Sequence, residues 1–231
     1  MDMFYGKKID GALHLSDAEQ KHLRVMRKSV GERIAVADGE GHVFTALIIA
    51  QSKRSIELQI VEQTSHLAPS DELCLAVAPT KNASRYEWMI EKLTEVGVTS
   101  IQPIYCEHSE RKHLRMDRLQ AHAVAAMKQS QRHWLPAVLA PMSFSDFIQA
   151  DRSDHRLIAS CDWEHTHDWP TEMHASATIL IGPEGGFSPV ELSIAIKHGY
   201  LSTRLSSHRL RTETAALYAA VRAEASGLRL G

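Results

Sequence analysis

The chain has 231 residues, of which 44% are hydrophobic and 23% are charged, and its formal net charge is −2 at pH 7. This composition is typical of globular proteins, and the length suffices for one large domain or two smaller ones. It argues against a protein that coats nucleic acid with a broadly basic surface, although a local basic patch stays compatible with it.

The sequence carries no sign of a membrane or secreted protein. No apolar run approaches the roughly 18 residues that span a bilayer, and the N-terminal stretch lacks the apolar core of a signal peptide. The three cysteines, Cys74, Cys106 and Cys161, are odd in number and widely spaced, which favours reduced thiols over a disulfide framework. We therefore expect a cytoplasmic protein.

Residues 1–66 are predicted to form a small β-rich unit. Strands are expected at residues 33–38, 43–50 and 55–62, the last of which alternates apolar and polar side chains. Gly39 and Gly41 favour a turn between the first two strands, because glycine tolerates positive φ. The stretch 67–71, which is polar and contains a proline, is interpreted as a linker.

Strands alternate with helices in the rest of the chain, 72–231. The expected strands are 73–78, 101–106, 156–161 and 177–181, and the expected helices begin near Ser84, Asp117, Ser188 and Thr212. Ser84 with Glu87 has the spacing of a capping box, and Gly97 is expected just past the end of that helix. Such alternation predicts a largely parallel sheet with helices on its faces.

The sharpest chemical signal is the loop from Gly182 to Phe187. A buried strand runs into this glycine-rich loop, which runs into a helix with Ser188 as N-cap, Pro189 in first position and Glu191 at the third. Glycines let the backbone approach a ligand and leave amides free to donate hydrogen bonds. Beyond a parallel strand, such a loop indicates a ligand site, with a tight ligand-free connection as the alternative. It matches neither a Walker loop nor a dinucleotide-binding pattern.

A second polar loop precedes the last helix, which is expected at 212–225. Residues 205–211 read Leu-Ser-Ser-His-Arg-Leu-Arg, and Thr212 is expected to cap the helix, with Glu213 in its first turn. Arg211 and Glu213 are candidates for functional roles. The alternative is a surface ion pair, which has little energetic weight.

These segments together resemble the RsmE family, the 16S ribosomal RNA uracil-N3 methyltransferases of the SPOUT superfamily. The likeness rests on the runs 182–187, 210–216 and 85–97, and on shorter pieces at 108–112 and 129–132. Residues 22–32 are similar to the family's N-terminal PUA-like RNA-binding domain. Each piece is modest alone, but their order and spacing cover nearly the whole chain. The chain departs from the family's commoner residues at Lys128, Gln131, Ser206 and His208.

The resemblance implies an α/β fold: a SPOUT-type C-terminal domain with a deep trefoil knot and a mostly parallel sheet, plus a small N-terminal PUA-like β-barrel. It also implies a homodimer whose two subunits complete the active site. S-adenosylmethionine is the implied cofactor, held by loops at 158–161, 182–187 and 205–210. The residues expected to bind it are Ala159, Ser160, Gly182, Pro183, Glu184, Gly185, Gly186, Phe187, Leu205, Ser206, Ser207, His208, Leu210, Arg211 and Thr212.

The implied substrate is a uridine of 16S ribosomal RNA in the small ribosomal subunit. We expect Arg211 to stabilise the uracil anion that forms when N3 loses its proton, and Glu213 to orient Arg211 or to relay that proton. The target base must be splayed out of the folded RNA before it can react. The N-terminal domain is expected to hold phosphates with His22, Arg24, Arg27 and Lys28.

Other functions stay open at this point. The histidine-rich stretch 161–168 lacks the ligand spacing of a metal site, and we expect no metal. A non-catalytic RNA-binding assembly factor with a degenerate enzyme domain is the main competing hypothesis, and a SPOUT enzyme acting on transfer RNA is another. Binding of S-adenosylmethionine tests the first, and a comparison of RNA substrates tests the second.

Overall fold

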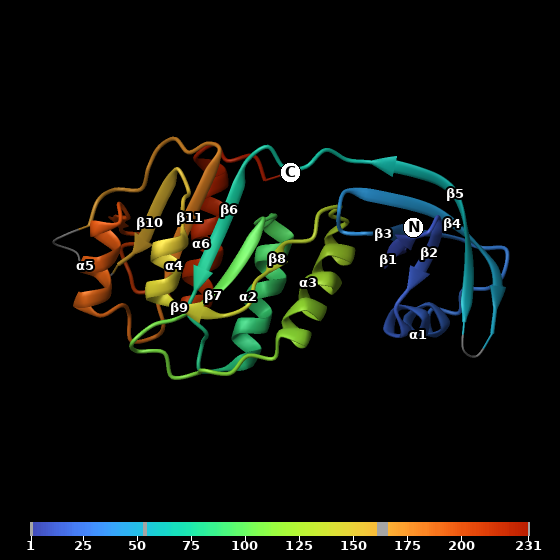
Figure 1. The fold of residues 1–231 in the computed structure, drawn as a ribbon, viewed down its shortest axis with the longest axis horizontal. Coiled ribbons are helices and arrows are strands. Elements are labelled where there is room, and N and C mark those ends of the chain that lie inside the picture. Colours follow the sequence, from blue (N-terminus) through green and yellow to red (C-terminus); the bar gives the residue numbers. More distant parts are fainter. Residues whose placement is uncertain (1, 53–54, 161–165, 231) are drawn as a thin grey trace. The chain divides into compact units, whose positions relative to one another are not determined.

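The computed structural model describes residues 2–52, 55–160 and 166–230 of the chain (Figure 1). The chain divides into two compact units. The N-terminal unit consists of Met1–Ala68 and Val124–Leu135, and the C-terminal unit of Pro69–Ala123 and Pro136–Gly231. The structure thus adds residues 124–135 to the N-terminal unit, while the domain division at 67–71 stays a prediction.

The N-terminal unit is built on a five-stranded sheet. Its strands, in the order β2-β1-β3-β4-β5, are β1 (Met3–Ile9), β2 (Ala12–Leu15), β3 (Arg33–Ala37), β4 (His42–Gln51) and β5 (Ile56–Ser65). Neighbouring strands are antiparallel except for the parallel pair β1 and β3. The end strands β2 and β5 are in contact, and the unit buries a core that includes Phe4, Leu23 and Phe44. The three predicted strands are confirmed.

Three elements at the start of the chain were not predicted: β1, β2 and helix α1 (Asp17–Val25). The turn between the two strands is Asp10-Gly11, and both residues have positive φ, 50° and 82°, as tight hairpins require. Helix α1 begins after Ser16, whose side chain accepts a hydrogen bond from the amide of Glu19 at 3.3 Å. The Asp-Gly pair and the serine cap are local signals that the sequence does contain.

Two departures from the family pattern lie in the N-terminal unit, at the end of helix α3 (Met116–Ser130). The Lys128 ammonium forms an ion pair with the buried carboxylate of Glu19, which also accepts a hydrogen bond from the amide of Tyr5 at 3.2 Å. Gln131 follows the helix with φ 57°, in the left-handed region that glycine enters most readily. The lysine is therefore matched by a carboxylate, and the glutamine adopts a backbone conformation in which glycine is less strained.

The C-terminal unit contains a seven-stranded sheet. Its strands are β6 (Glu72–Val77), β7 (Ser100–Tyr105), β8 (Ala137–Val138), β9 (Met142–Ser143), β10 (His155–Ala159), β11 (Ser176–Ile181) and β12 (Leu201–Thr203). Their order is β12-β10-β11-β6-β7-β8, with β9 also beside β7, and all of these pairs are parallel. The predicted α/β fold with a mostly parallel sheet is confirmed, whereas the trefoil knot stays a prediction.

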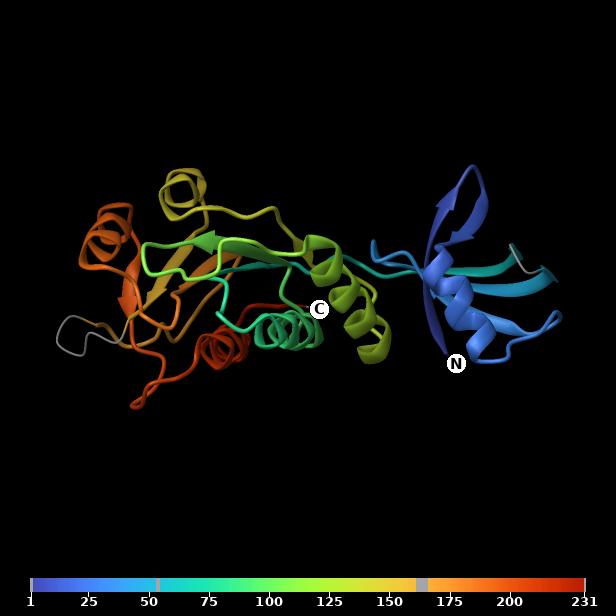
Figure 2. The ribbon, with the colours of Figure 1, turned by 90° about the horizontal axis from the view of Figure 1, so that it is seen from below.

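Helices cover both faces of this sheet, as Figure 2 shows. Helices α4 (Phe144–Ala150) and α5 (Pro189–Lys197) lie on one face, and α2 (Ala83–Val96) and α6 (Thr212–Ala225) lie on the other. The first face buries Phe144, Phe147 and Ala195 in one cluster with Ile104 and Leu180. Helix α6 contacts α2, β6 and β11 and carries several buried alanines. Because both faces are covered, a ligand reaches the backbone most easily at the strand ends.

The starts of two helices differ from the sequence prediction. Helix α2 is capped by Asn82 rather than Ser84, because the Asn82 side chain accepts a hydrogen bond from the Ser84 amide at 2.9 Å. The N-cap residue of α6 is Arg211 rather than Thr212. The Thr212 hydroxyl instead donates to the carbonyl of Gly182 at 3.1 Å, so a long-range contact replaces the predicted local cap.

Other helix boundaries confirm the sequence prediction. Helix α2 ends at Val96 and is followed by its C-cap residue Gly97, which has φ 98°. Ser188 and Glu191 form a reciprocal capping box at the start of α5. The strands β8 and β9 and helix α4 were not predicted, since such short elements carry little periodicity. Within the described part of the chain, no helix is long and apolar enough to cross a membrane.

Two free cysteines, Cys74 and Cys106, lie in the C-terminal unit, while Cys161 falls outside the described residues. Burial raises the pKa of Cys74 to about 11 and also raises the pKa of Cys106. The fold favours the neutral thiol of Cys74. The contribution of this thiol to the free energy of unfolding is therefore complete below about pH 9 and is lost as the pH rises towards 11.

We expect the folded Cys161→Ser variant to react with an alkylating reagent at pH 8 at least about 100-fold more slowly than the same variant unfolded in denaturant. The reason is that the raised pKa values of Cys74 and Cys106 leave little reactive thiolate in the folded protein. Removal of Cys161 restricts the readout to the two described thiols. The measurement is a time course of alkylation followed by mass spectrometry. Equal rates in the two states would show that burial does not control these thiols.

Candidate functional site

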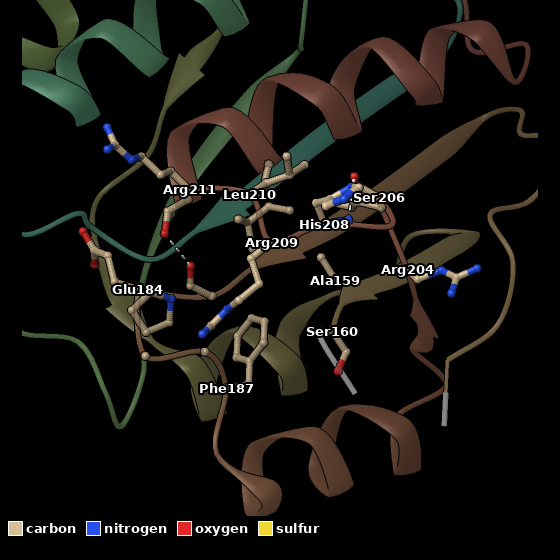
Figure 3. Close-up of a pocket in the computed structure, with 18 of the residues that line it drawn as sticks. Ala159, Ser160, Glu184, Phe187, Arg204, Ser206, His208, Arg209, Leu210 and Arg211 are labelled. Atoms are coloured by element: carbon tan, nitrogen blue, oxygen red, sulfur yellow. Dashed lines mark hydrogen bonds between the residues drawn. The ribbon is translucent and has the colours of Figure 1, made fainter. Parts of the chain in front are cut away.

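The loops that follow β10, β11 and β12 meet at one edge of the sheet, because parallel strands direct their carboxyl ends the same way. These loops and the first turns of α5 and α6 enclose a cavity of about 470 Å³ (Figure 3). Small-molecule sites in proteins commonly measure roughly 300–1,000 Å³. The edge of the sheet therefore holds a cavity of the size that a nucleoside-like ligand needs.

The glycines of the loop after β11 lie where a side chain would be crowded or the backbone has positive φ. A side chain at Gly182 would meet the Phe187 ring at 3.1 Å, and one at Gly185 would meet the Cβ atom of His108 at the same distance. Gly186 has φ 75°, and its amide donates to the carbonyl of Pro183 at 2.8 Å, which closes a tight turn. The loop thus brings bare backbone to the cavity wall.

The side chain of Glu184 ties this loop to the neighbouring strand end. Its carboxylate accepts a hydrogen bond from the amide of Lys81, which follows β6, at 3.0 Å. Arg111, which follows β7, donates two hydrogen bonds to the carbonyl of Lys81, at 3.0 and 3.3 Å. Three loops from three adjacent parallel strands are therefore connected by charged side chains that bind backbone groups.

A second carboxylate, that of Glu191 on α5, also binds backbone groups near this loop. Its side chain is buried and accepts hydrogen bonds from the amide of Ser188 at 2.8 Å and from the amide of Glu107 at 2.9 Å. The first bond belongs to the capping box of α5, and the second reaches the loop after β7. Sequence spacing predicted the first bond, but the second joins residues 84 positions apart.

The loop after β12 has its own hydrogen bonds at the positions where the chain departs from the family pattern. The Ser206 hydroxyl accepts a hydrogen bond from the amide of His208 at 3.2 Å. The Ser207 hydroxyl and Nδ1 of His208 lie 3.0 Å apart. A serine turn therefore stabilises this loop conformation locally.

The structure gathers nearly all of the predicted cofactor-binding residues around the one cavity. Ser207 does not line it, and neither does Glu213, one of the two predicted catalytic residues. Sequence analysis missed Ile181, Leu192, Arg204, Arg209 and Ala215, which also line it. Arg209 lies in the polar loop 205–211 already singled out and Arg204 directly precedes it, whereas the places of Leu192 on α5 and Ala215 on α6 depend on helix packing.

Three arginines line the cavity, against one carboxylate. Figure 3 shows Arg209 extending across the cavity towards Phe187, while the side chains of Arg204 and Arg211 point away from its middle. Arg211 is exposed at the rim. A ligand cavity bordered by exposed cations is suited to a substrate that carries negative charge, such as a phosphate-linked polymer.

Glu213 pairs with Arg85 rather than forming the surface ion pair with Arg211 that the sequence left as an alternative. Glu213 is buried and lies 3.7 Å from Nε of Arg85 on helix α2. Among the described residues, this carboxylate forms one ion pair, and its partner is Arg85. Any orientation of Arg211 by Glu213 would therefore need a rearrangement.

The predicted RNA-binding residues lie around helix α1 in the N-terminal unit and differ in their availability. Arg24 donates to the carbonyl of Ser52 at 3.1 Å, and Lys28 is paired with two carboxylates. His22 and Arg27 are exposed, although the His22 ring packs 5.5 Å from that of Phe4. Arg27 is therefore the most accessible cation of the predicted set.

No group of three or more metal-ligating side chains occurs within the described ranges 2–52, 55–160 and 166–230. Residues 161–165 of the histidine-rich stretch lie outside those ranges.

Comparison with known proteins assigns a family. The RNA methyltransferase domain model matches residues 67–224, and the RNA methyltransferase PUA domain model matches residues 15–61. The ribosomal RNA small subunit methyltransferase E of Aquifex aeolicus (strain VF5) is 30% identical over 221 residues, which is 93% of this chain and 95% of that protein. The chain belongs to the RsmE family of ribosomal RNA methyltransferases. The predicted family and its PUA-like domain are confirmed.

Two solved structures share the RsmE-family fold along almost the entire chain. A probable rRNA-methyltransferase from Porphyromonas gingivalis superposes with a TM-score of 0.90 and 35% identity, covering 98% of both chains. A ribosomal RNA small subunit methyltransferase E from Neisseria gonorrhoeae, bound to S-adenosyl methionine, superposes with a TM-score of 0.79 and 28% identity, covering 96% of both chains.

We expect Glu191→Ala to lower the free energy of unfolding of this RsmE-family protein by roughly 3 kcal/mol, because two amides lose a charged acceptor. Glu191→Gln keeps one acceptor oxygen and should cost about half as much. Equilibrium unfolding in urea measures both changes. Glu224→Ala removes an exposed carboxylate from α6 and is the control, expected within about 0.5 kcal/mol of wild type. A loss at Glu191 no larger than in this control would contradict its anchoring role.

Proposed function

We propose that this RsmE-family protein transfers a methyl group from S-adenosylmethionine to N3 of a uridine in the 16S ribosomal RNA of the small ribosomal subunit. The observation that carries the proposal is the glycine-bordered cavity at the carboxyl edge of the parallel sheet. The Neisseria gonorrhoeae methyltransferase, which shares this fold, is bound to S-adenosyl methionine. A substrate in the ribosome makes the cytoplasm the proposed place of action.

The residues of the cavity fit such a cofactor. Leu205 and Leu210 supply apolar wall for an adenine ring, and the loop 182–187 supplies backbone without side chains in the way. When bound, the cofactor supplies an electrophilic methyl group, a chemistry that amino-acid side chains lack. The chain contributes shape and orientation, and fixing two reactants in place is worth roughly 7 to 11 kcal/mol.

The target nitrogen needs activation, because uracil N3 carries a proton and becomes a good nucleophile once that proton leaves. In this proposal Arg211 donates hydrogen bonds to the uracil oxygen on which negative charge develops. Its exposed position at the rim suits contact with an incoming base. The buried carboxylate of Glu213, held near Arg85, is the proposed proton relay.

We propose that the protein acts as a homodimer, and the surface of the C-terminal unit supports this. Helices α2 and α6 pack side by side and expose Trp88, Tyr218 and Val221, each by 40% or more. Large aromatic and apolar side chains of this kind are enriched at the centres of protein interfaces. Sedimentation at micromolar concentration tests the assembly.

We expect calorimetry to show binding of S-adenosylmethionine, and mass spectrometry to show methylated uridine in small-subunit RNA incubated with the protein and the cofactor. Arg211→Ala should lower turnover at saturating RNA about 100-fold, since it removes charge stabilisation from the reacting base. Arg229→Ala removes an exposed arginine outside the cavity and should leave turnover unchanged.

The outcomes separate the competing functions. Absence of cofactor binding would favour a non-catalytic assembly factor, and methylation of transfer RNA in preference to ribosomal RNA would reassign the substrate. Near wild-type turnover in Arg211→Ala would remove Arg211 from the mechanism while leaving the reaction itself intact.

We expect Arg27→Gln to weaken binding of 16S ribosomal RNA. The slope of log affinity against log salt concentration should become shallower by about 0.7 to 0.9, the range for one lost phosphate contact on single-stranded and duplex nucleic acid. Lys28→Gln is the matched control and should change the slope less, because Lys28 is already paired with Asp2 and Glu32. Affinity titrations at several salt concentrations give the slopes. Equal slopes for Arg27→Gln and wild type would place the RNA elsewhere on the N-terminal unit.

A further inference from the structure

Arg222, in the last turn of helix α6, reaches a loop that lines the cavity. Its guanidinium donates a hydrogen bond to the carbonyl of Leu205 at 2.9 Å and a longer one to that of Arg204 at 3.5 Å. Both of these residues line the cavity, whereas Arg222 itself does not. We propose that Arg222 is a positioning residue that sets the loop 204–210 in its cofactor-binding conformation, an inference that rests on the proposed function.

The guanidinium is held in place by aromatic rings. It lies 4.8 Å from the centre of the Trp169 ring and 5.9 Å from that of Tyr218, distances at which a cation is attracted to the π face. Trp169 is buried, and its indole nitrogen donates to the Ser226 hydroxyl at 3.0 Å. The donor to the loop is therefore itself fixed by neighbours on two sides.

This arrangement joins three segments, two of which also meet through backbone hydrogen bonds. The three segments are the end of α6, the stretch that contains Trp169, and the start of the loop after β12. The amide of His167 donates to the carbonyl of Ser202 at 2.8 Å, and the amide of Arg204 donates to the carbonyl of His167 at 3.3 Å. We call the guanidinium of Arg222, the Trp169 ring and the Leu205 carbonyl the Arg222 clamp. The hydroxyl of Ser226 donates to the carbonyl of Pro170 at 2.9 Å, which anchors the same stretch to α6.

The loop needs such support because it has no regular secondary structure from residue 204 to residue 210. The Leu205 side chain is buried and lines the cavity. A hydrogen bond that fixes the carbonyl of Leu205 therefore also restrains the position of this side chain. Arginine suits this task because its planar fork both stacks on a ring and donates to two carbonyls. Lysine offers only a compact ammonium, so it should substitute incompletely.

Hydrogen exchange in the cofactor-free protein tests the clamp independently of any reaction. Arg222→Met keeps an apolar stem but removes the donors, and we expect exchange of loop amides 204–210 to become at least about 10-fold faster. Lys197→Met is the matched control, because Lys197 is the basic residue in the last turn of α5 and lies outside the cavity. Unchanged exchange in a folded Arg222→Met would overturn the proposal.

Binding and kinetics then test whether the clamp serves the cofactor. We expect Arg222→Met to raise the Kd and KM for S-adenosylmethionine about 10-fold, with Arg222→Lys intermediate and kcat at saturation within about twofold of wild type. Trp169→Leu should raise the same constants more than Trp169→Phe, which keeps a ring. A change in kcat or in RNA affinity alone would overturn the positioning role.

Failure of this inference and failure of the proposed function are distinguishable. If wild type itself does not bind S-adenosylmethionine, the proposed function fails, and the exchange experiment still decides whether Arg222 orders the loop. If Arg222→Met does not fold, Arg222→Lys carries both measurements, and wild-type values for its exchange and its cofactor affinity would overturn the proposal.

Discussion

The parallel register of the C-terminal sheet is the constraint on which the site depends. Pairing of β10 with β11 and β12, and of β11 with β6, carries the ends Val77, Ala159, Ile181 and Thr203 to one edge, although they are distant in the sequence. Helices on both faces leave that edge as the place where bare backbone meets a ligand. If this register slipped, the glycine loop and the arginine-rich loop would no longer share a cavity.

Charged side chains that bind backbone groups hold the loops at this edge. Glu184 accepts a hydrogen bond from the amide of Lys81, and Glu191 accepts one from an amide of the loop after β7. Arg222 donates a hydrogen bond to the carbonyl of Leu205. Each bond satisfies a polar group that regular secondary structure leaves unpaired. Together they preorganise a cavity whose walls are mostly irregular chain, which is what precise placement of a small ligand requires.

Charge is distributed locally rather than over the whole protein. The net charge of −2 conceals a cavity with three arginines and one carboxylate. In the N-terminal unit, in contrast, Lys28 and Lys128 are paired with carboxylates, and Arg24 is bound to a carbonyl. A protein of this kind can recognise a polyanion through a few positioned cations while most of its basic side chains stabilise the fold.

The sequence by itself determined the features whose signals act within one turn of chain. The end of α2 before Gly97, the capping box of α5 and the glycine loop after β11 follow from residues at most four positions apart. The Asp10-Gly11 turn has a local signal of the same kind, although the turn was not predicted. Only the tertiary structure decided that the Thr212 hydroxyl donates a hydrogen bond to the Gly182 carbonyl instead of capping its helix. It also decided that Glu213 faces Arg85 rather than Arg211, and that Leu192 and Ala215 line the cavity. Those contacts depend on strand order and helix packing, which bring together residues whose separation in sequence carries no local signal.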